Sequence, residues 1–160
     1  MRLAIHAVGR LKAGPERELA ERYLERLARS GPAVGLEFAG VTEHAESRAG
    51  TASLRRRDEA ERLSAQIPPQ AAIIALDETG KNIDSAAFAE RIGRLRDDGS
   101  AAMAFVIGGP DGLDPELRQR ADLVLSFGAL TWPHQIARIL LAEQLYRAVT
   151  ILSGHPYHRA

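Results

Sequence analysis

The sequence predicts an α/β fold in which a mostly parallel sheet carries helices on both faces. Strand-like and helix-like segments alternate five times along the chain, a pattern typical of parallel sheets with helical crossovers. Two strand-like runs, 71–77 and 101–107, are apolar almost throughout, which is typical of strands covered on both faces. With 160 residues and no repeat or linker, the chain is expected to form a single domain, residues 1–160.

The first third of the chain predicts two strands around one helix. Residues 2–9 are expected to form a strand with Leu3, Ile5 and Ala7 on one face. Pro15 stands at the favoured first turn of a helix that Gly31-Pro32 ends. Residues 34–41 predict a second strand, and the polar segment 42–52 predicts a loop.

The rest of the chain predicts four helices and three strands. Ser53 is expected to cap a helix that ends before Pro68-Pro69, and Asp84 or Ser85 to cap the next one. The remaining elements follow in order: a strand at 71–77, a strand at 101–107, a short helix at 115–121, a strand at 122–127 and a long helix at 134–152.

Composition excludes several classes of protein. The chain has 21 Lys and Arg against 21 Asp and Glu, so its net charge gives no general attraction to nucleic acid or membrane, although both ends are mildly basic. It has no Cys, which excludes disulfides, thiolate metal sites and Cys nucleophiles, and we expect no metal. The absence of a long apolar run predicts no membrane span, and we expect a cytoplasmic protein.

Three glycine-containing loops directly follow apolar strands, at 77–81, 108–112 and 128–134. Ligands of open parallel sheets bind beyond the carboxyl ends of the strands, so these loops are expected to converge on one site. The last loop contains Trp132, the only Trp of the chain. The alternative is that all three are ordinary strand-to-helix turns, which use the same residue types.

The ligand expected in this site is an uncharged nucleoside. The sequence has no GxxxxGK[ST] motif, and GGPDG at 108–112 departs from GxGxxG, so a phosphate-anchoring loop is not indicated. Backbone groups could bind an adenine edge while Leu76, Ile107 and Leu130 cover its faces. Adenosine that carries a sulfonium and an amino acid tail fits this description.

The chain end concentrates reactive side chains in the sequence HPYHR. Its histidines titrate near neutrality, its tyrosine can stack and its arginine is a cation. The alternative is a mobile tail. Among the other histidines, His6 is expected to be structural, and His134 either belongs to the site or caps the last helix.

Four motifs in order resemble the RlmH family: GGPDGL, LSFGALTWPHQIAR, EQLYRA and HPYHR. This resemblance covers essentially the whole chain. It implies a bacterial S-adenosylmethionine enzyme of the SPOUT superfamily that methylates N3 of a pseudouridine in large-subunit ribosomal RNA and releases S-adenosylhomocysteine. It also implies a C-terminal trefoil knot and a homodimer in which each active site is completed by the partner subunit.

The resemblance also assigns site residues. The implied cofactor site consists of Leu76, Gly108, Phe127, Gly128, Ala129, Leu130, Thr131 and Trp132. We expect Trp132 to shield the cofactor and to hold the loop rigid, with its indole N–H bonded.

For the transfer step we hypothesise that Arg159 stabilises the anion that develops on the base. His155 or His158 would accept its proton or contact RNA. Tyr157 would stack on a base, and Arg138 would orient a carbonyl or phosphate.

The neutral net charge predicts weak binding to naked RNA, so the substrate is expected to be the assembled ribosome, with Arg2, Arg10 and Lys12 adding phosphate contacts. Two alternatives remain open. The chain could be a SPOUT methyltransferase that acts on tRNA, or a non-catalytic nucleotide-binding regulator.

Overall fold

In the computed structural model, which describes residues 1–158, five strands form one sheet of order β2-β1-β4-β3-β5, and each neighbouring pair is parallel. The parallel sheet predicted from the alternation of elements is therefore confirmed. The strands are β1 (Arg2–Val8), β2 (Glu37–His44), β3 (Ala72–Lys81), β4 (Ala102–Ile107) and β5 (Leu123–Leu125).

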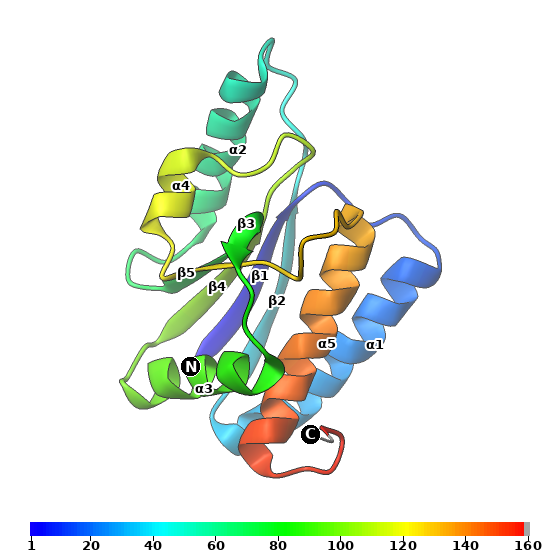
Figure 1. Cartoon of the computed structure of the whole chain (residues 1–160), viewed down its shortest axis with the longest axis vertical. Helices are drawn as coiled ribbons and strands as arrows, with labels where there is room; N and C mark the ends of the chain where they lie inside the picture. Colours follow the sequence, from blue (N-terminus) through cyan, green and yellow to red (C-terminus); the bar gives the residue numbers. More distant parts are fainter. Residues whose placement is uncertain (159–160) are drawn as a thin grey trace.

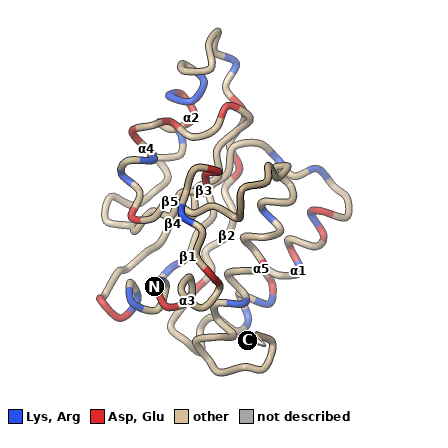
Figure 2. Tube along the Cα trace, in the orientation of Figure 1, with Lys and Arg blue, Asp and Glu red and all other residues tan. Residues whose placement is uncertain are grey.

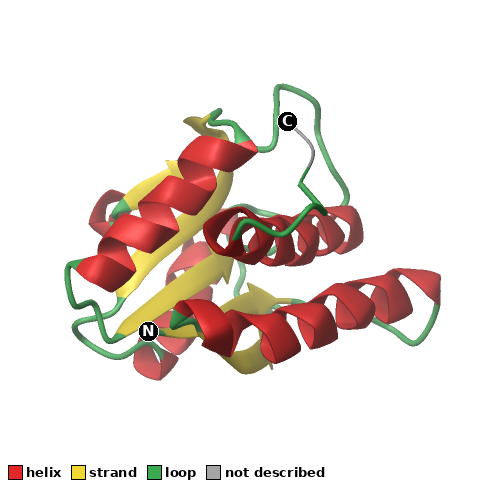
Figure 3. Cartoon of the chain, turned by 90° about the horizontal axis from the view of Figure 1, so that it is seen from below, coloured by secondary structure: helices red, strands yellow, loops and turns green. Residues whose placement is uncertain are grey.

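Helices cover both faces of the sheet, as predicted (Figures 1 and 3). One face packs against α1, α3 and α5 in a core that contains Phe105 and Phe88, whose rings meet edge to face at 6.2 Å. The other face packs against α2 and α4 around Leu63 and Leu117. The helices are α1 (Pro15–Ser30), α2 (Ala52–Gln66), α3 (Ser85–Asp97), α4 (Pro115–Arg120) and α5 (His134–Ser153).

Local side-chain hydrogen bonds set the helix ends. Asp84 accepts a hydrogen bond from the backbone N–H of Ala87 and caps α3, as expected. The cap of α2 is Thr51 rather than Ser53, because its hydroxyl accepts from the N–H of Leu54. Gly154, at a left-handed φ of 70°, ends α5.

The second strand lies further along the chain than the sequence predicts. Residues 31–34 form a 3-10 turn that closes on Gly35 at a φ of 72°, and β2 begins only at Glu37. The strand then continues to His44, which pairs with Val8 at the end of β1. The start of the predicted loop 42–52 is therefore strand, because β1 is long enough to pair with it.

The predicted loop 77–81 is the second half of β3. Leu125 of β5 pairs with both Leu76 and Lys81, and the N–H of Ser126 donates to the carbonyl oxygen of Lys81 at 3.0 Å. A Cβ on Gly80 would lie 2.7 Å from the carbonyl carbon of Leu125. Only glycine therefore fits at this point, where the second half of β3 crosses the end of β5. The crossing agrees with a chain that wraps around β5, and the trefoil knot itself stays a prediction.

Across residues 1–158, none of the helices is both long and apolar enough to cross a membrane. Charged residues of both signs are interspersed along the trace (Figure 2).

Candidate functional site

The carboxyl ends of β3, β4 and β5 open into a cavity of about 530 Å³. Each of the three glycine-containing segments contributes to its lining, so the predicted convergence is confirmed. The strand ends supply apolar lining through Leu76, Ile107 and Leu125. This position follows the rule that open parallel sheets bind ligands beyond their strand carboxyl ends.

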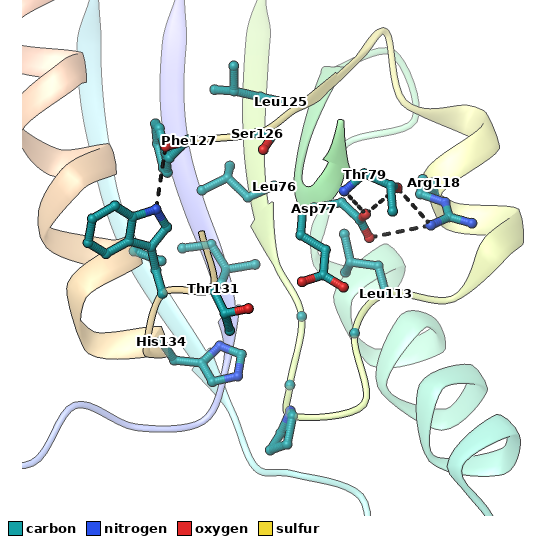
Figure 4. Close-up of a pocket in the computed structure, with 18 of the residues that line it drawn as sticks. Leu76, Asp77, Thr79, Leu113, Arg118, Leu125, Ser126, Phe127, Thr131 and His134 are labelled. Atoms are coloured by element: carbon teal, nitrogen blue, oxygen red, sulfur yellow. Dashed lines mark hydrogen bonds and ion pairs between the residues drawn. The ribbon is translucent and has the colours of Figure 1, made fainter. Parts of the chain in front are cut away.

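Labelled side chains approach the cavity from two sides (Figure 4). One wall, next to the start of α5, carries Phe127, Thr131 and His134. The other wall carries the polar side chains of Asp77 and Arg118. A ligand that spans the cavity would therefore meet Phe127 on one side and the Asp77 carboxylate on the other.

Loop 108–112 is a tight turn that brings backbone to the cavity. The N–H of Gly112 donates to the carbonyl oxygen of Gly109 at 2.9 Å, and Gly112 has a left-handed φ of 83°. A Cβ on Gly108 would lie 2.9 Å from the carbonyl carbon and oxygen of Gly112. The loop can therefore close only with glycine at position 108.

The loop before α5 is held by its own hydrogen bonds. The Ser126 hydroxyl donates to the carbonyl oxygen of Gly128 and accepts from its N–H, at 3.0 and 3.2 Å. The indole N–H of Trp132 donates to the carbonyl oxygen of Phe127 at 3.4 Å, so the expected partner for this group is present. Residues Leu130 and Trp132 are nevertheless 72% and 42% exposed, which leaves apolar surface at the cavity edge.

Asp77 forms a small charged network. Its carboxylate accepts from the N–H and hydroxyl of Thr79, and Arg118 lies at 3.5 Å. Burial would raise the pKa of Asp77, but the hydrogen bonds from Thr79 and the Arg118 guanidinium lower it below its usual range. The carboxylate is thus ionised at neutral pH and can accept further hydrogen bonds from a ligand.

The structure brings almost the whole implied cofactor set together. Leu76, Gly108, Phe127, Gly128, Leu130, Thr131 and Trp132 line the cavity, whereas Ala129, although described, is outside the lining. Leu113, the last residue of the motif GGPDGL, also lines it, as do Arg56 and Arg118, which the sequence did not single out. Arg56 and Arg118 lie on α2 and α4, and no motif marks them, because only the packing of these helices brings them to the site.

Arg138 is buried away from this cavity. Its side chain is 8% exposed and donates to Glu43 at the end of β2 and to the carbonyl oxygen of Gly9. Burial would raise the pKa of Glu43, but hydrogen bonds from the N–H of Leu11 and from Arg138 lower it. Arg138 lines a second cavity of about 240 Å³, and any role of its side chain toward a substrate stays a prediction.

The chain end folds back on α5. The Tyr157 hydroxyl donates to Glu143 at 3.1 Å, its ring lies 4.8 Å from that of Tyr146, and the Arg147 guanidinium lies 5.1 Å from the ring of Tyr157. Burial, together with Tyr23 and Glu143, raises the pKa of Tyr157, so its hydroxyl stays protonated.

The two tail histidines make fewer contacts than Tyr157. The Nδ1 atom of His158 is buried without a hydrogen-bond partner among the described residues, and the Nδ1 atom of His155 accepts from the N–H of Tyr157. Arg159 lies outside the described residues.

The chain end and the loop before α5, which contributes to the cavity lining, lie at opposite ends of this helix (Figure 1). This helix has 20 residues, and a helix of that length spans about 30 Å. His134 at its start lines the cavity, whereas Tyr157 packs beyond its end. Within one chain the structure therefore does not bring the described tail residues His155, Tyr157 and His158 to the cavity. Among residues 1–158, no group of three or more His, Cys, Asp or Glu side chains could hold a metal ion.

Comparisons with known proteins give one consistent family. The family described as "Predicted SPOUT methyltransferase" matches residues 1–158. A relative from Mesorhizobium japonicum named "Ribosomal RNA large subunit methyltransferase H" is 65% identical over 160 residues, which cover all of both chains. A relative of the same name from Brucella anthropi is 64% identical, again over the whole of both chains.

Among solved structures, the chain matches the SpoU methyltransferase AviRb from Streptomyces viridochromogenes in complex with AdoMet, at 14% identity and a TM-score of 0.38. The match covers 92% of this chain but only 59% of that structure, so it adds nothing to the assignment. The sequence relationships carry it instead, and they confirm the resemblance carried by the four motifs: the chain belongs to the SPOUT methyltransferase family.

Proposed function

We propose that the chain is an S-adenosylmethionine-dependent methyltransferase that methylates N3 of a pseudouridine in large-subunit ribosomal RNA. The observation that carries this proposal is the convergence of the motif residues Leu76, Gly108 and the 127–132 loop on one cavity. It is supported by the name of a full-length relative at 65% identity, "Ribosomal RNA large subunit methyltransferase H".

The cavity residues fit the cofactor. Leu76, Ile107 and Leu125 provide an apolar surface for an adenine ring, and the turn at Gly108 lets backbone approach it. The ionised Asp77 is a suitable partner for a ribose hydroxyl or an ammonium group. When bound, the cofactor supplies the reactive methyl group on a sulfonium.

The chain's own task in the reaction is to orient the base and to stabilise the loss of its N3 proton. A cation near the neighbouring carbonyl oxygens would stabilise the anion, and we assign this role to Arg159. His155 or His158 would accept the proton or contact RNA, and Tyr157 would stack on a base.

These tail groups would act on the partner's cavity in a homodimer. The support is the length of α5, which separates the tail of one chain from the cavity of the same chain. The exposed side chains of Leu130 and Trp132 at the cavity edge would then be covered by the partner or by RNA. The zero net charge supports a folded ribosomal surface as substrate, recognised by shape rather than by charge.

Mass spectrometry of ribosomal RNA fragments from methylation-deficient ribosomes incubated with protein and cofactor tests this function. We expect one new methyl group on a pseudouridine of the large-subunit RNA, with less transfer to isolated RNA than to assembled ribosomes. Transfer to tRNA would indicate the tRNA-modifying alternative. Cofactor binding without transfer to any RNA would indicate a regulator.

A further inference from the structure

Side chains from the first two turns of α2 bind loop 108–112 and hold it in place, an arrangement called the brace below. The Arg55 guanidinium donates to both carboxylate oxygens of Asp111, at 2.6 and 3.0 Å. This two-pronged geometry fixes direction as well as distance. The adjacent Arg56 also reaches the carbonyl oxygen of Asp111, at 3.4 Å. Figure 2 shows Lys and Arg positions in blue near the start of α2.

Glu59, one turn further along α2, is buried against the same loop. Its side chain lies so close to Gly109 that a Cβ there would meet its two carboxylate oxygens at 3.1 and 3.3 Å. One oxygen accepts from the N–H of Ser47 at 2.9 Å, and the other has no hydrogen-bond partner among the described residues. The residue is 3% exposed, and burial of a carboxyl oxygen without a hydrogen bond costs free energy.

The same two side chains also hold segment 45–51. Arg55 donates to the carbonyl oxygen of Ala49 at 3.1 Å, and Glu59 accepts from Ser47. Each side chain therefore touches both loop 108–112 and segment 45–51. Neither lines the cavity, whereas Asp111 and Gly109 do.

We propose that Arg55 and Glu59 are positioning residues that hold loop 108–112 in its cofactor-binding shape and couple it to segment 45–51. This inference rests on the proposed function, since it concerns the same cofactor site. A loop held in its bound conformation before binding loses less entropy when the ligand arrives, which raises affinity. Loss of the brace would therefore weaken cofactor binding more than it slows methyl transfer.

The test compares Arg55→Met with Arg57→Met. Arg57 is a matched control, because it lies two residues away on the same helix and its pair with Glu61 is mostly exposed. We expect Arg55→Met to raise the Kd for S-adenosylmethionine about tenfold, or about 1.4 kcal/mol. The KM for cofactor should rise in parallel, with kcat at saturating cofactor within about twofold of wild type. Arg55→Lys keeps the charge but loses the two-pronged geometry, so its Kd for S-adenosylmethionine should lie between those of the wild type and Arg55→Met.

A double-mutant cycle tests whether the effect passes through Asp111. If it does, Asp111→Asn added to Arg55→Met should speed amide exchange in loop 108–112 little further, because the partner is already lost. Full additivity of the two changes, or a Kd unchanged in Arg55→Met, would overturn the inference. A fall in kcat that follows a lower Tm, with KM unchanged, would mark a merely structural role and would overturn it as well.

Hydrogen exchange of the cofactor-free protein gives a readout that does not depend on the proposed function. In both Arg55→Met and Glu59→Gln we expect faster amide exchange in loop 108–112 and segment 45–51, but not in the α3 region, and no such change in Arg57→Met. Unchanged exchange would overturn the brace. Failure of the wild-type protein to bind S-adenosylmethionine would instead contradict the proposed function, and the exchange data would still decide whether the brace exists.

Discussion

Arg138 in the first turns of α5 forms an ion pair with Glu43, 95 residues earlier at the end of β2. The same guanidinium donates to the carbonyl oxygen of Gly9, and the Glu43 carboxylate accepts from the N–H of Leu11. The pair therefore ties the start of α5 to the carboxyl ends of two strands. Because loop 128–133 leads directly into α5, this tie also fixes one end of the cavity wall.

Arg138→Met should destabilise the fold strongly. Removal of one partner of a buried ion pair leaves the other charge uncompensated and costs about 3–5 kcal/mol, and we expect a value near the lower end because Glu43 is 29% exposed. Urea unfolding measures this change. The control is Arg94→Met, whose pair with Glu90 is mostly exposed and should contribute less than about 1 kcal/mol. Equal losses in the two variants would contradict the structural role of Arg138.

His6 on β1 and His44 on β2 should make the stability of the fold decrease in mild acid. His6 is buried, its ring lies 6.4 Å from that of His44, and its Nδ1 atom has no partner among the described residues. Burial and the neighbouring His44 lower the pKa of His6 below its usual 6.5. The unfolded chain then binds more protons than the folded one, so stability is fully present above pH 6.5 and declines as the pH falls through the folded pKa.

His6→Leu should therefore reduce the loss of stability between pH 7 and pH 5. Urea midpoints at several pH values measure the slope. Leu54→Ala serves as the control, because this exposed side chain carries no titratable group and its loss should leave the slope unchanged. An identical slope in His6→Leu and the wild-type protein would exclude His6 as its source.

Gly80→Ala should destabilise the crossing of β3 and β5. The added Cβ would lie 2.7–2.8 Å from backbone atoms of Val124 and Leu125, which cannot move without breaking the pairing of Lys81 with Leu125. We expect a cost of about 1–3 kcal/mol in the free energy of unfolding. Gly50→Ala is the control, since nothing lies within 4 Å of its Cβ position and the change should be close to neutral. A neutral Gly80→Ala would mean that the two segments are not packed as described.

Much of this fold follows from local patterns. The apolar runs 71–77 and 101–107 and the long helix from His134 lie close to where their residues predict them, because these elements are dictated by their own composition. The site followed from the same patterns, since parallel strands bring their carboxyl ends, and hence their glycine loops, to one edge.

What the patterns missed depends on contacts between distant segments. Residues 77–81 look like a loop, but β5 pairs with them and makes them strand. The sequence predicts that Arg138 orients a carbonyl or phosphate, but gives no sign that its guanidinium donates to Glu43 and to the carbonyl oxygen of Gly9. Arg56 and Arg118 reach the cavity only because α2 and α4 pack on one face of the sheet. The residues next to these positions in the sequence do not indicate any of these contacts.

Trp132 should report on cofactor binding directly. It is the only Trp of the chain and it lines the cavity while 42% exposed, so its fluorescence should change as S-adenosylmethionine binds. Trp132→Ala should weaken binding about tenfold through lost apolar contact, and Trp132→Phe less, since only the hydrogen bond to Phe127 is lost. Leu54→Ala, an exposed apolar side chain outside the cavity, should leave the Kd unchanged. Equal affinity in wild type and Trp132→Ala would remove Trp132 from the cofactor site.

Two inactive variants should restore activity when mixed, if the tail of one subunit serves the cavity of the other. A chain truncated after Ser153 keeps its cavity but lacks the tail, and we expect it to bind cofactor without transferring methyl. In Gly108→Val, the added Cβ would lie 2.9 Å from backbone atoms of Gly112. Loop 108–112 then cannot keep its shape and the cofactor site is lost, whereas the tail remains intact.

Random exchange of subunits would produce mixed dimers in which one site combines an intact cavity with an intact tail, so about a quarter of the wild-type activity should return. The measurement is methyl transfer to ribosomes after co-refolding of the two chains, with each variant refolded alone as the control. If instead the tail of each chain acted on the cavity of the same chain, the mixture would stay inactive. Neither variant chain has both an intact cavity and an intact tail.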